Sequence, residues 1–148
     1  MATVESARSQ NMRQLLLRAS RLVNRHVVEA LRARGYGDLR ATHTTLLSNI
    51  DLAGSTVTEA ADRAGVTKQA MGRLAAELEG AGYITVQSNP EDARVRILCL
   101  TEKGMRLMLD SLDVMDNLEL RYAHIVGQTR LADIMHGLAA FIENADRD

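Results

Sequence analysis

The chain has 148 residues, a net charge of −1, and apolar and charged fractions of 46% and 25%. This length suits a single domain with its own hydrophobic core. No apolar run approaches the roughly 20 residues of a membrane span, and the first residues lack a signal peptide's basic and apolar regions. We therefore expect a cytoplasmic protein that does not enter a membrane. Cys99 is the only cysteine, which excludes an intrachain disulfide and a cysteine-based zinc site within one chain.

Positive and negative charges are separated along the chain. Eight arginines and three acidic residues lie up to Arg40, whereas four arginines and eight acidic residues lie from Met105 onward. The segment from Thr56 to Gly104 is close to neutral. If the protein binds nucleic acid, a generally basic surface cannot supply the affinity, so specific contacts and a dimer must do so.

Residues from about 6 to 34 are predicted to form one long helix, with His26 on its apolar face as an interface histidine rather than a ligand. Four arginines cluster on another face of this helix: Arg18, Arg21, Arg25 and Arg32. Two interpretations of this cluster stay open. It is either a solvated face, or a surface that contacts phosphate or pairs with the acidic C-terminal helices.

The residues Gly35-Tyr36-Gly37-Asp38 end this helix, and the next is expected over residues 42–50, with Leu46, Leu47 and Ile50 inward. A third helix is predicted to begin after Thr56, because Thr56 and Glu59 have the spacing of a capping box. Gly65 is expected to end that helix.

A fourth helix is predicted from Lys68 to about Gly80, with Thr67 as its N-cap. At about 100° per residue, one face of this helix is apolar and is expected to lie in the core: Met71, Leu74, Ala75 and Leu78. The other face is polar or small and is expected to be exposed: Lys68, Gln69, Gly72, Arg73 and Ala76.

Two β-rich runs follow, residues 82–87 and 95–100, joined by the polar loop 88–94. This order of elements, helix, turn, helix and hairpin, is that of a winged helix-turn-helix. A helix of this kind fits the major groove of DNA, and a charged hairpin tip can reach the minor groove or the phosphates.

Two further helices are predicted, from Glu102, with Thr101 as cap, to about Ile125, and from about Leu131 to the end, with Gly127-Gln128-Thr129 between them. The expected inward face of the first holds Met105, Met108, Leu109, Leu112, Met115 and Tyr122. Both helices carry more apolar surface than a small domain can cover, which predicts that they meet another surface.

Residues 56–104 resemble the MarR (multiple antibiotic resistance regulator) family. The likeness is carried by Thr-x-x-Glu at Thr56, Thr-Lys-Gln at Thr67, Leu-Glu-x-x-Gly-Tyr ending at Tyr83, Asn-Pro-Glu-Asp-Ala-Arg in the loop, and Leu-Thr-Glu-Lys-Gly ending at Gly104. The loop has Asp92-Ala93-Arg94 where the family usually has Asp-Arg-Arg, and Gln69 and Gly72 stand where small hydroxyl residues are frequent. These differences concern the target sequence rather than the mode of binding.

The resemblance implies a mainly α fold with a small β-hairpin wing, in a single domain covering residues 1–148. The winged helix-turn-helix would span about residues 40–104, and dimerisation helices would span about 6–34 and 105–146. It implies a homodimeric regulator that acts as a repressor, binds double-stranded DNA at a near-palindromic operator and is released by a small-molecule effector. The DNA-binding residues expected are Thr67, Lys68, Gln69, Gly72, Arg73, Asp92, Arg94 and Arg96. By resemblance alone, Tyr36 and His43 are effector-pocket residues.

Two other classes of function are alternatives. In the first, the winged helix is a protein-interaction module without specific DNA binding, which the near-neutral segment favours. In the second, the chain is an enzyme, but the four histidines lack metal-ligand spacing, no glycine-rich phosphate loop is present, and Ser and Asp lack a nucleophile context. We therefore expect no catalytic residues, no metal site and no cofactor.

Overall fold

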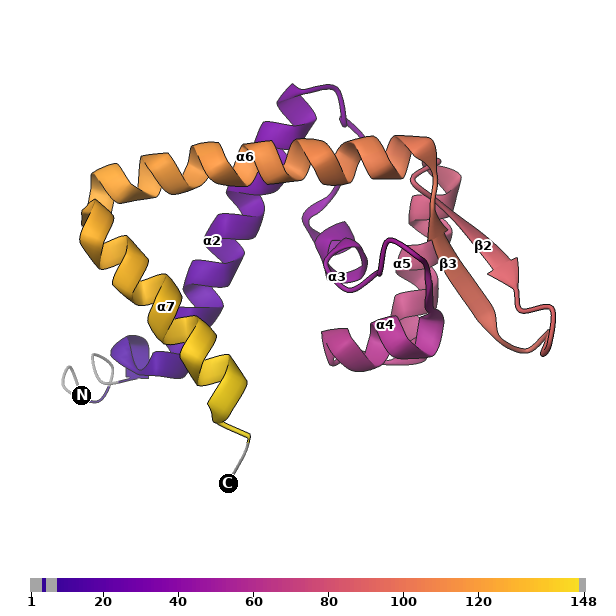
Figure 1. The fold of residues 1–148 in the computed structure, drawn as a ribbon, viewed down its shortest axis with the longest axis horizontal. Coiled ribbons are helices and arrows are strands. Elements are labelled where there is room, and N and C mark those ends of the chain that lie inside the picture. The colour runs from indigo at the N-terminus through magenta and orange to yellow at the C-terminus, as the bar shows by residue number, and fades with distance from the viewer. Residues whose placement is uncertain (1–3, 5–7, 147–148) are drawn as a thin grey trace. The chain divides into compact units, whose positions relative to one another are not determined.

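The computed structural model describes residue 4 and residues 8–146 (Figure 1). The chain divides into two compact units, Met1–Ser111 and Leu112–Asp148, and the long helix α6 (Glu102–Val126) contributes to both. The chain is mainly helical with one small antiparallel sheet, which confirms the expected fold class. No helix in the described ranges is long and apolar enough to cross a membrane.

The first long helix, α2 (Met12–Ala33), begins later than the sequence predicts. Asn11 is its N-cap, because the Asn11 side chain accepts a hydrogen bond from the Gln14 amide at 3.1 Å. Asparagine bonds readily to nearby backbone and therefore favours such a boundary over a helix interior. Residues 8–10 form a separate helical turn before it, so the prediction of one unbroken helix was wrong here. The predicted start at residue 6 lies outside the described residues.

The helix expected over residues 42–50 is also shorter than predicted. It consists of a 3₁₀ turn, η1 (Ala41–His43), and a single α-helical turn, α3 (Thr44–Leu47). The Asn49 side chain donates to the carbonyl of Thr45 at 2.9 Å, which satisfies a carbonyl of the last turn and ends the helix. Leu46 and Ile50 are nevertheless buried, as expected.

The helices α4 (Val57–Ala64) and α5 (Lys68–Gly80) have the predicted bounds. The capping box is present: the Thr56 hydroxyl accepts from the Glu59 amide at 3.1 Å, and the Glu59 carboxylate accepts from the Thr56 amide at 2.8 Å. Gly65 ends α4 at φ +66°, a left-handed conformation that glycine adopts without steric cost. The turn from Gly65 to Thr67 therefore fixes the direction in which α5 leaves α4.

The sheet contains the predicted hairpin, β2 (Ile84–Ser88) and β3 (Arg96–Leu100), and a third strand, β1 (Ser55–Thr56), on the other side of β3. All pairs are antiparallel, and Val86 lies opposite Leu98. Two residues are too short for a strand period to be visible in the sequence, so β1 was not predicted. The core of this unit lies between the helices and the sheet, and includes Leu39, Leu46, Met71, Leu78, Tyr83, Ile84, Leu98 and Leu107.

A polar cluster around Asp38 joins the loop after α2 to the start of α6. The Tyr83 hydroxyl donates to the Asp38 carboxylate, and the Lys103 ammonium lies 3.3 Å from the same carboxylate. The Lys103 ammonium also donates to the Ala81 carbonyl at 2.7 Å and lies 4.1 Å from the centre of the Tyr83 ring. The hydrogen bond from Tyr83, followed by that from Lys103, lowers the pKa of the Asp38 carboxyl below its ordinary value.

This lowered pKa predicts how acid affects the protein. Because the folded-state pKa of Asp38 lies below the unfolded value, the stability that the ionised carboxylate contributes is present above about pH 4 and is lost as the pH falls through the folded-state pKa. We expect Asp38→Asn to lower the melting temperature at pH 7 and to change it less at pH 3. Thermal unfolding of both proteins across this pH range measures the difference. The exposed control Asp133→Asn should follow the wild type. A difference in melting temperature between Asp38→Asn and the wild type that did not change with pH would contradict the lowered pKa of Asp38.

The second unit contains the end of α6 and the helix α7 (Gln128–Asn144), which are separated at Gly127 as predicted. Gln128 and Thr129, expected to lie between the helices, form the first turn of α7. The inward face of α6 was predicted wrongly. Leu109 and Leu112 are exposed, whereas Leu107, Val114 and Leu118 are buried. Apolar residues occur on more than one side of α6, so helical periodicity alone does not define a single inward face. None of the side chains of α7 is buried, although it carries Ile134, Met135, Phe141 and Ile142.

Candidate nucleic-acid interface

Helix α5 presents a polar face to solvent while its opposite face lies in the core. Met71, Ala75 and Leu78 are buried, as the sequence predicts. Lys68, Gln69 and Arg73 are exposed. Within the described part of the chain, no ion pair or side-chain hydrogen bond holds these three side chains, so each is free to contact another molecule.

The N-terminus of α5 is formed by Thr67. Its hydroxyl oxygen accepts a hydrogen bond from the Ala70 amide at 3.1 Å, which leaves the hydroxyl hydrogen available as a donor. The first turn of a helix carries unpaired amides and the positive end of the helix dipole, and both attract anions. No acidic residue lies in this first turn. The N-terminus of α5 is therefore electrostatically suited to a phosphate group.

The loop between β2 and β3 is held by its own hydrogen bonds. The Asn89 amide donates to the Val95 carbonyl at 2.9 Å, and the Asp92 carboxylate accepts from the Arg94 amide at 3.0 Å. Asp92 thus accepts from the backbone of Arg94 and not from its guanidinium. The exposed guanidinium forms no ion pair with any residue that the structure describes.

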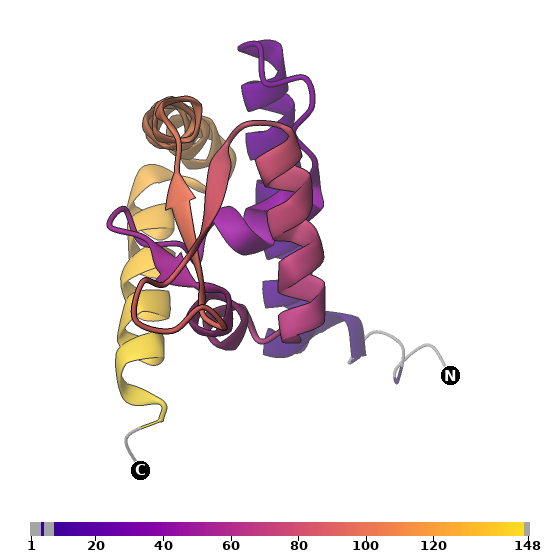
Figure 2. The same ribbon diagram turned by 90° about the vertical axis from the view of Figure 1, so that its right-hand side faces the viewer.

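A groove of about 600 Å³ lies between the start of α4, the start of α5 and the hairpin. Its cationic lining is Lys68, Arg94 and Arg96, and Gly72 belongs to the same lining. Figure 2 shows the hairpin running alongside α5, with its loop at the end where α4 lies. A smaller cavity of about 50 Å³ continues between α5 and the strands, again beside Gly72 and Arg96. A Cβ on Gly72 would meet no atom within 4 Å, so this glycine leaves open space.

The groove brings together four of the predicted site residues: Lys68, Gly72, Arg94 and Arg96. Thr67, Gln69, Arg73 and Asp92 do not line it. Its lining also includes three residues at the start of α4 that were not predicted from the sequence: Thr56, Val57 and Thr58. The signal for them was present, because the capping box at Thr56 marks a helix N-terminus, where anions are favoured.

The acidic residues of α5 lie in its C-terminal half and are paired there. The Glu77 carboxylate lies 2.6 Å from the Arg40 guanidinium and 2.9 Å from the His43 ring. The hydrogen bond with His43 lowers the pKa of Glu77, and the charge of Arg40 lowers it further. The Glu79 carboxylate accepts from the Val86 amide at 3.2 Å. The negative charges are therefore neutralised or hydrogen-bonded, away from the exposed cations at the start of the helix.

The two predicted effector residues are both hydrogen-bonded. His43 is buried, with Nδ1 accepting from the Arg40 amide at 3.1 Å and Nε2 facing Glu77, so the Nε2–H tautomer fits both contacts. The Tyr36 hydroxyl donates to the Asp110 carboxylate at 2.5 Å, which raises the pKa of Tyr36. His43 thereby connects η1 to α5, and Tyr36 connects the loop after α2 to α6.

Metal coordination is not indicated by the described residues, which contain no group of three or more His, Cys, Asp or Glu side chains placed to hold an ion. Two helices joined by a tight turn, the second with an exposed N-terminal face, and a hairpin whose loop carries an exposed arginine define a winged helix-turn-helix protein. The similarity of the chain to known proteins makes this class more specific.

Residues 38–95 match the model of the MarR family. The expected resemblance to the MarR family is thereby confirmed over these residues. No curated protein is similar enough to count as a match.

Several solved structures share the fold over most of the chain. The crystal structure of MarR is 22% identical, with a TM-score of 0.77 over 93% of this chain and 100% of that chain. The Mycobacterium tuberculosis transcriptional regulator MOSR, solved in complex with DNA, is 25% identical, with a TM-score of 0.63 over 93% and 99% of the two chains. CouR from Rhodococcus jostii RHA1, bound to p-coumaroyl-CoA, is 25% identical, with a TM-score of 0.66 over 90% and 92%.

Proposed function

We propose that this chain is a cytoplasmic, homodimeric transcriptional regulator that binds a specific DNA sequence and represses by occupying a near-palindromic operator. The observation that carries the proposal is the groove in which Lys68, Gly72, Arg94 and Arg96 meet. A groove bordered by a helix N-terminus and unpaired cations suits the DNA backbone beside a major-groove helix. MOSR, which shares the fold, was solved in complex with DNA.

In this proposal α5 enters the major groove with its N-terminal residues against base edges. Thr67 and Lys68 hold phosphate. The Thr67 hydroxyl hydrogen is free beside a helix N-terminus, and the Lys68 ammonium is free as well. Gln69 reads a base, for which adenine is the usual bidentate partner. Arg73 contacts guanine or the backbone, and Gly72, which has no side chain, allows the helix to approach closely.

The wing supplies the second contact. Arg94 and Arg96 are exposed cations, on the loop and on β3, and they reach the neighbouring minor groove or its phosphates. Asp92 fixes the loop by accepting from the Arg94 amide, which limits the positions that the Arg94 side chain can take. Its role is therefore to shape the wing and not to touch DNA.

A homodimer is part of the proposal because the terminal helices are not covered within one chain. No side chain of α7 is buried, and Phe141 and Ile142 are 48% and 75% exposed. Soluble monomers rarely leave large apolar patches in water. Two copies would place two α5 helices in successive major grooves, about 34 to 36 Å apart, which explains the expected near-palindromic operator.

Release by a small-molecule effector completes the proposal. CouR, with a similar fold, was solved bound to p-coumaroyl-CoA. In this chain Tyr36 and His43 are the proposed effector residues. The His43 ring bonds to Glu77 of α5, so a ligand that displaced this contact would disturb the helix that reads DNA.

Replacing Arg94 with alanine tests the wing. We expect the variant to bind its operator more weakly by about 1 to 3 kcal/mol, because a contact to a base edge or a narrow minor groove is lost. The melting temperature of the free protein should not change, because the exposed guanidinium has no ion-pair partner in the described ranges. Titration of a labelled operator selected from random DNA measures the first effect, and thermal unfolding measures the second.

The matched control is Arg130→Ala, which removes an exposed arginine from α7, far along the chain from the wing. It should retain the affinity of the wild type. If Arg94→Ala also retained that affinity with an unchanged melting temperature, Arg94 would not belong to the interface.

A further inference from the structure

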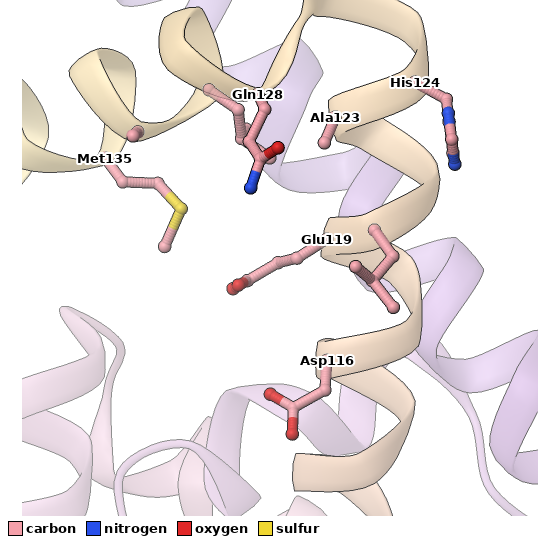
Figure 3. A pocket seen from close by; sticks show the side chains of 9 residues that line it. Asp116, Glu119, Ala123, His124, Gln128 and Met135 are labelled. Atoms are coloured by element: carbon pink, nitrogen blue, oxygen red, sulfur yellow. The ribbon is translucent and has the colours of Figure 1, made fainter.

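Glu79 is an exposed residue of α5 whose carboxylate is bound to the hairpin. Exposed carboxylates ordinarily extend into open space, as Figure 3 shows for Asp116 and Glu119 on α6. The Glu79 carboxylate instead accepts a hydrogen bond from the Val86 amide of β2 at 3.2 Å. Among the residues that the structure describes, this is the one side-chain hydrogen bond that joins α5 to the hairpin.

The Val86 amide points to the outer side of the sheet. The Asn89 amide donates to the Val95 carbonyl at 2.9 Å. Hydrogen-bonded pairs alternate along an antiparallel ladder, so the register of β2 and β3 directs the Val86 amide away from β3. β2 is the outer strand, and no strand of the described chain lies beyond it. The Glu79 carboxylate thus supplies the partner that the sheet does not.

Packing fixes the base of the hairpin but not the part nearer the start of α5. Ile84 and Leu98 are buried at the base. Gly72, seven residues before Glu79 and on the same side of α5, borders the cavity of about 50 Å³ and the groove of about 600 Å³. Atoms on the two sides of such a space make no contact across it. The hydrogen bond of Glu79 therefore limits how far the hairpin can move relative to α5.

The loop that carries Arg94 amplifies any such movement. Val86 is two residues from Ile84, where β2 enters the core, and Ser88 is four residues from it. Because a strand rises about 3.3 Å per residue, a rotation about Ile84 moves Ser88 about twice as far as Val86, and the loop further. Residues of a binding site must be held within about 0.5 Å of their productive positions. A small shift at Val86 is therefore enough to remove Arg94 from its contact.

We propose that Glu79 is a positioning residue, which holds the hairpin at the distance from α5 at which Arg94 and the residues of α5 contact DNA together. This inference rests on the proposed DNA-binding function and adds to it a residue that does not touch DNA. The negative charge of Glu79 repels phosphate and lowers affinity, whereas its hydrogen bond to Val86 raises affinity. The two effects have opposite signs, so substitutions can separate them.

Glutamine and alanine at position 79 make this separation. Glu79→Gln removes the charge and keeps an oxygen that can accept from the Val86 amide, whereas Glu79→Ala removes both. The variants are titrated on the operator selected from random DNA and on a duplex of the same composition in shuffled order. We expect Glu79→Gln to bind the operator at least as tightly as the wild type, and Glu79→Ala to bind it about 5-fold more weakly than Glu79→Gln. On the shuffled duplex the two variants should agree, because each has lost one negative charge.

Combining each variant with Arg94→Ala tests the position of the hairpin. We expect Arg94→Ala to weaken operator binding about 5-fold or more in the wild type and in Glu79→Gln. In Glu79→Ala it should weaken binding less than about 2-fold, because the hairpin no longer holds Arg94 in place. A purely structural role of Glu79 would not change the effect of Arg94→Ala. The matched control Glu91→Ala removes an exposed carboxylate from the loop itself and should leave the effect of Arg94→Ala unchanged.

Hydrogen exchange at the Val86 amide, followed by NMR on the free proteins, measures the hydrogen bond without DNA. Exchange should be slow in the wild type and in Glu79→Gln, and about 10-fold faster or more in Glu79→Ala. Thermal unfolding checks that all variants remain folded at the temperature of the measurements.

The outcomes distinguish this inference from the proposed function. Equal operator affinities for Glu79→Gln and Glu79→Ala, or an unchanged exchange rate at Val86 in Glu79→Ala, would overturn the positioning role. The same holds if Arg94→Ala has no effect in the wild type, or an equal effect in Glu79→Ala; sequence-specific binding by α5 would then remain. A wild-type protein that does not prefer its operator to the shuffled duplex would overturn the proposed function, and this inference with it.

Discussion

Replacing Gly104 with alanine is expected to cost the fold about 3 kcal/mol or more, a large share of the 5 to 15 kcal/mol that stabilises a typical domain. Gly104 is buried in the first turn of α6. A Cβ at this position would overlap the carbonyl oxygen of Tyr83 and lie 3.1 Å from the Leu100 side chain. The Tyr83 carbonyl cannot move away easily, because it accepts from both the amide and the hydroxyl of Thr101, each at 3.0 Å.

Thermal unfolding at a fixed protein concentration measures this effect, and we expect the melting temperature to fall by about 10 °C. The matched control is Gly72→Ala, also in a helix, where a Cβ would meet nothing within 4 Å. That change should stabilise the protein by up to about 1 kcal/mol, because alanine is the better helix former. If the proposed close approach to DNA is correct, Gly72→Ala should also weaken operator binding. A melting temperature for Gly104→Ala within about 2 °C of the wild type would contradict the close packing.

Replacing Phe141 with glutamate is expected to separate the proposed dimer and to abolish tight operator binding. Phe141 is 48% exposed on α7, so in a monomer the substitution would be tolerated. In a dimer it would bury one unpaired carboxylate from each copy, which is strongly unfavourable. A monomer holds one half-site only, so it loses the avidity that a two-fold operator provides.

Sedimentation at several concentrations and a titration of the operator measure the two effects. The matched control is Ala140→Glu, which places the same charge on the neighbouring, exposed position but on the opposite side of α7 from Ile134, Phe141 and Ile142. It should stay dimeric and should bind DNA. A Phe141→Glu protein that remained dimeric would remove this face of α7 from the interface.

The sequence predicted most accurately the elements whose ends have their own chemical signal. Thr56 with Glu59, Gly65 and Thr67 set both bounds of α4 and the start of α5 to the residue, because they lie at helix ends, where backbone groups are otherwise left unpaired. The pattern of α5 likewise predicted which side is buried. These are local interactions, and they are readable without knowledge of the rest of the fold.

Features that depend on residues distant in the sequence were not predicted. The buried face of α6 was assigned wrongly, since a helix with apolar residues on several sides is oriented by its neighbours. The hydrogen bonds of His43 to Glu77 and of Tyr36 to Asp110 join residues 34 and 74 positions apart, which no local pattern reveals. The part that the start of α4 plays in the groove was missed although the capping box at Thr56 gave a local signal for it.

The most direct test of the proposed function compares the wild-type protein on two duplexes over a range of salt concentrations. One duplex is enriched from random DNA by the protein itself, and the other has the same composition in shuffled order. We expect the enriched duplex to be a near-palindrome, to bind at least about 1,000-fold more tightly than the shuffled one, and to lose affinity steeply as salt rises. Equal affinity for both duplexes, or no measurable binding to either at low salt, would contradict sequence-specific DNA binding by this protein.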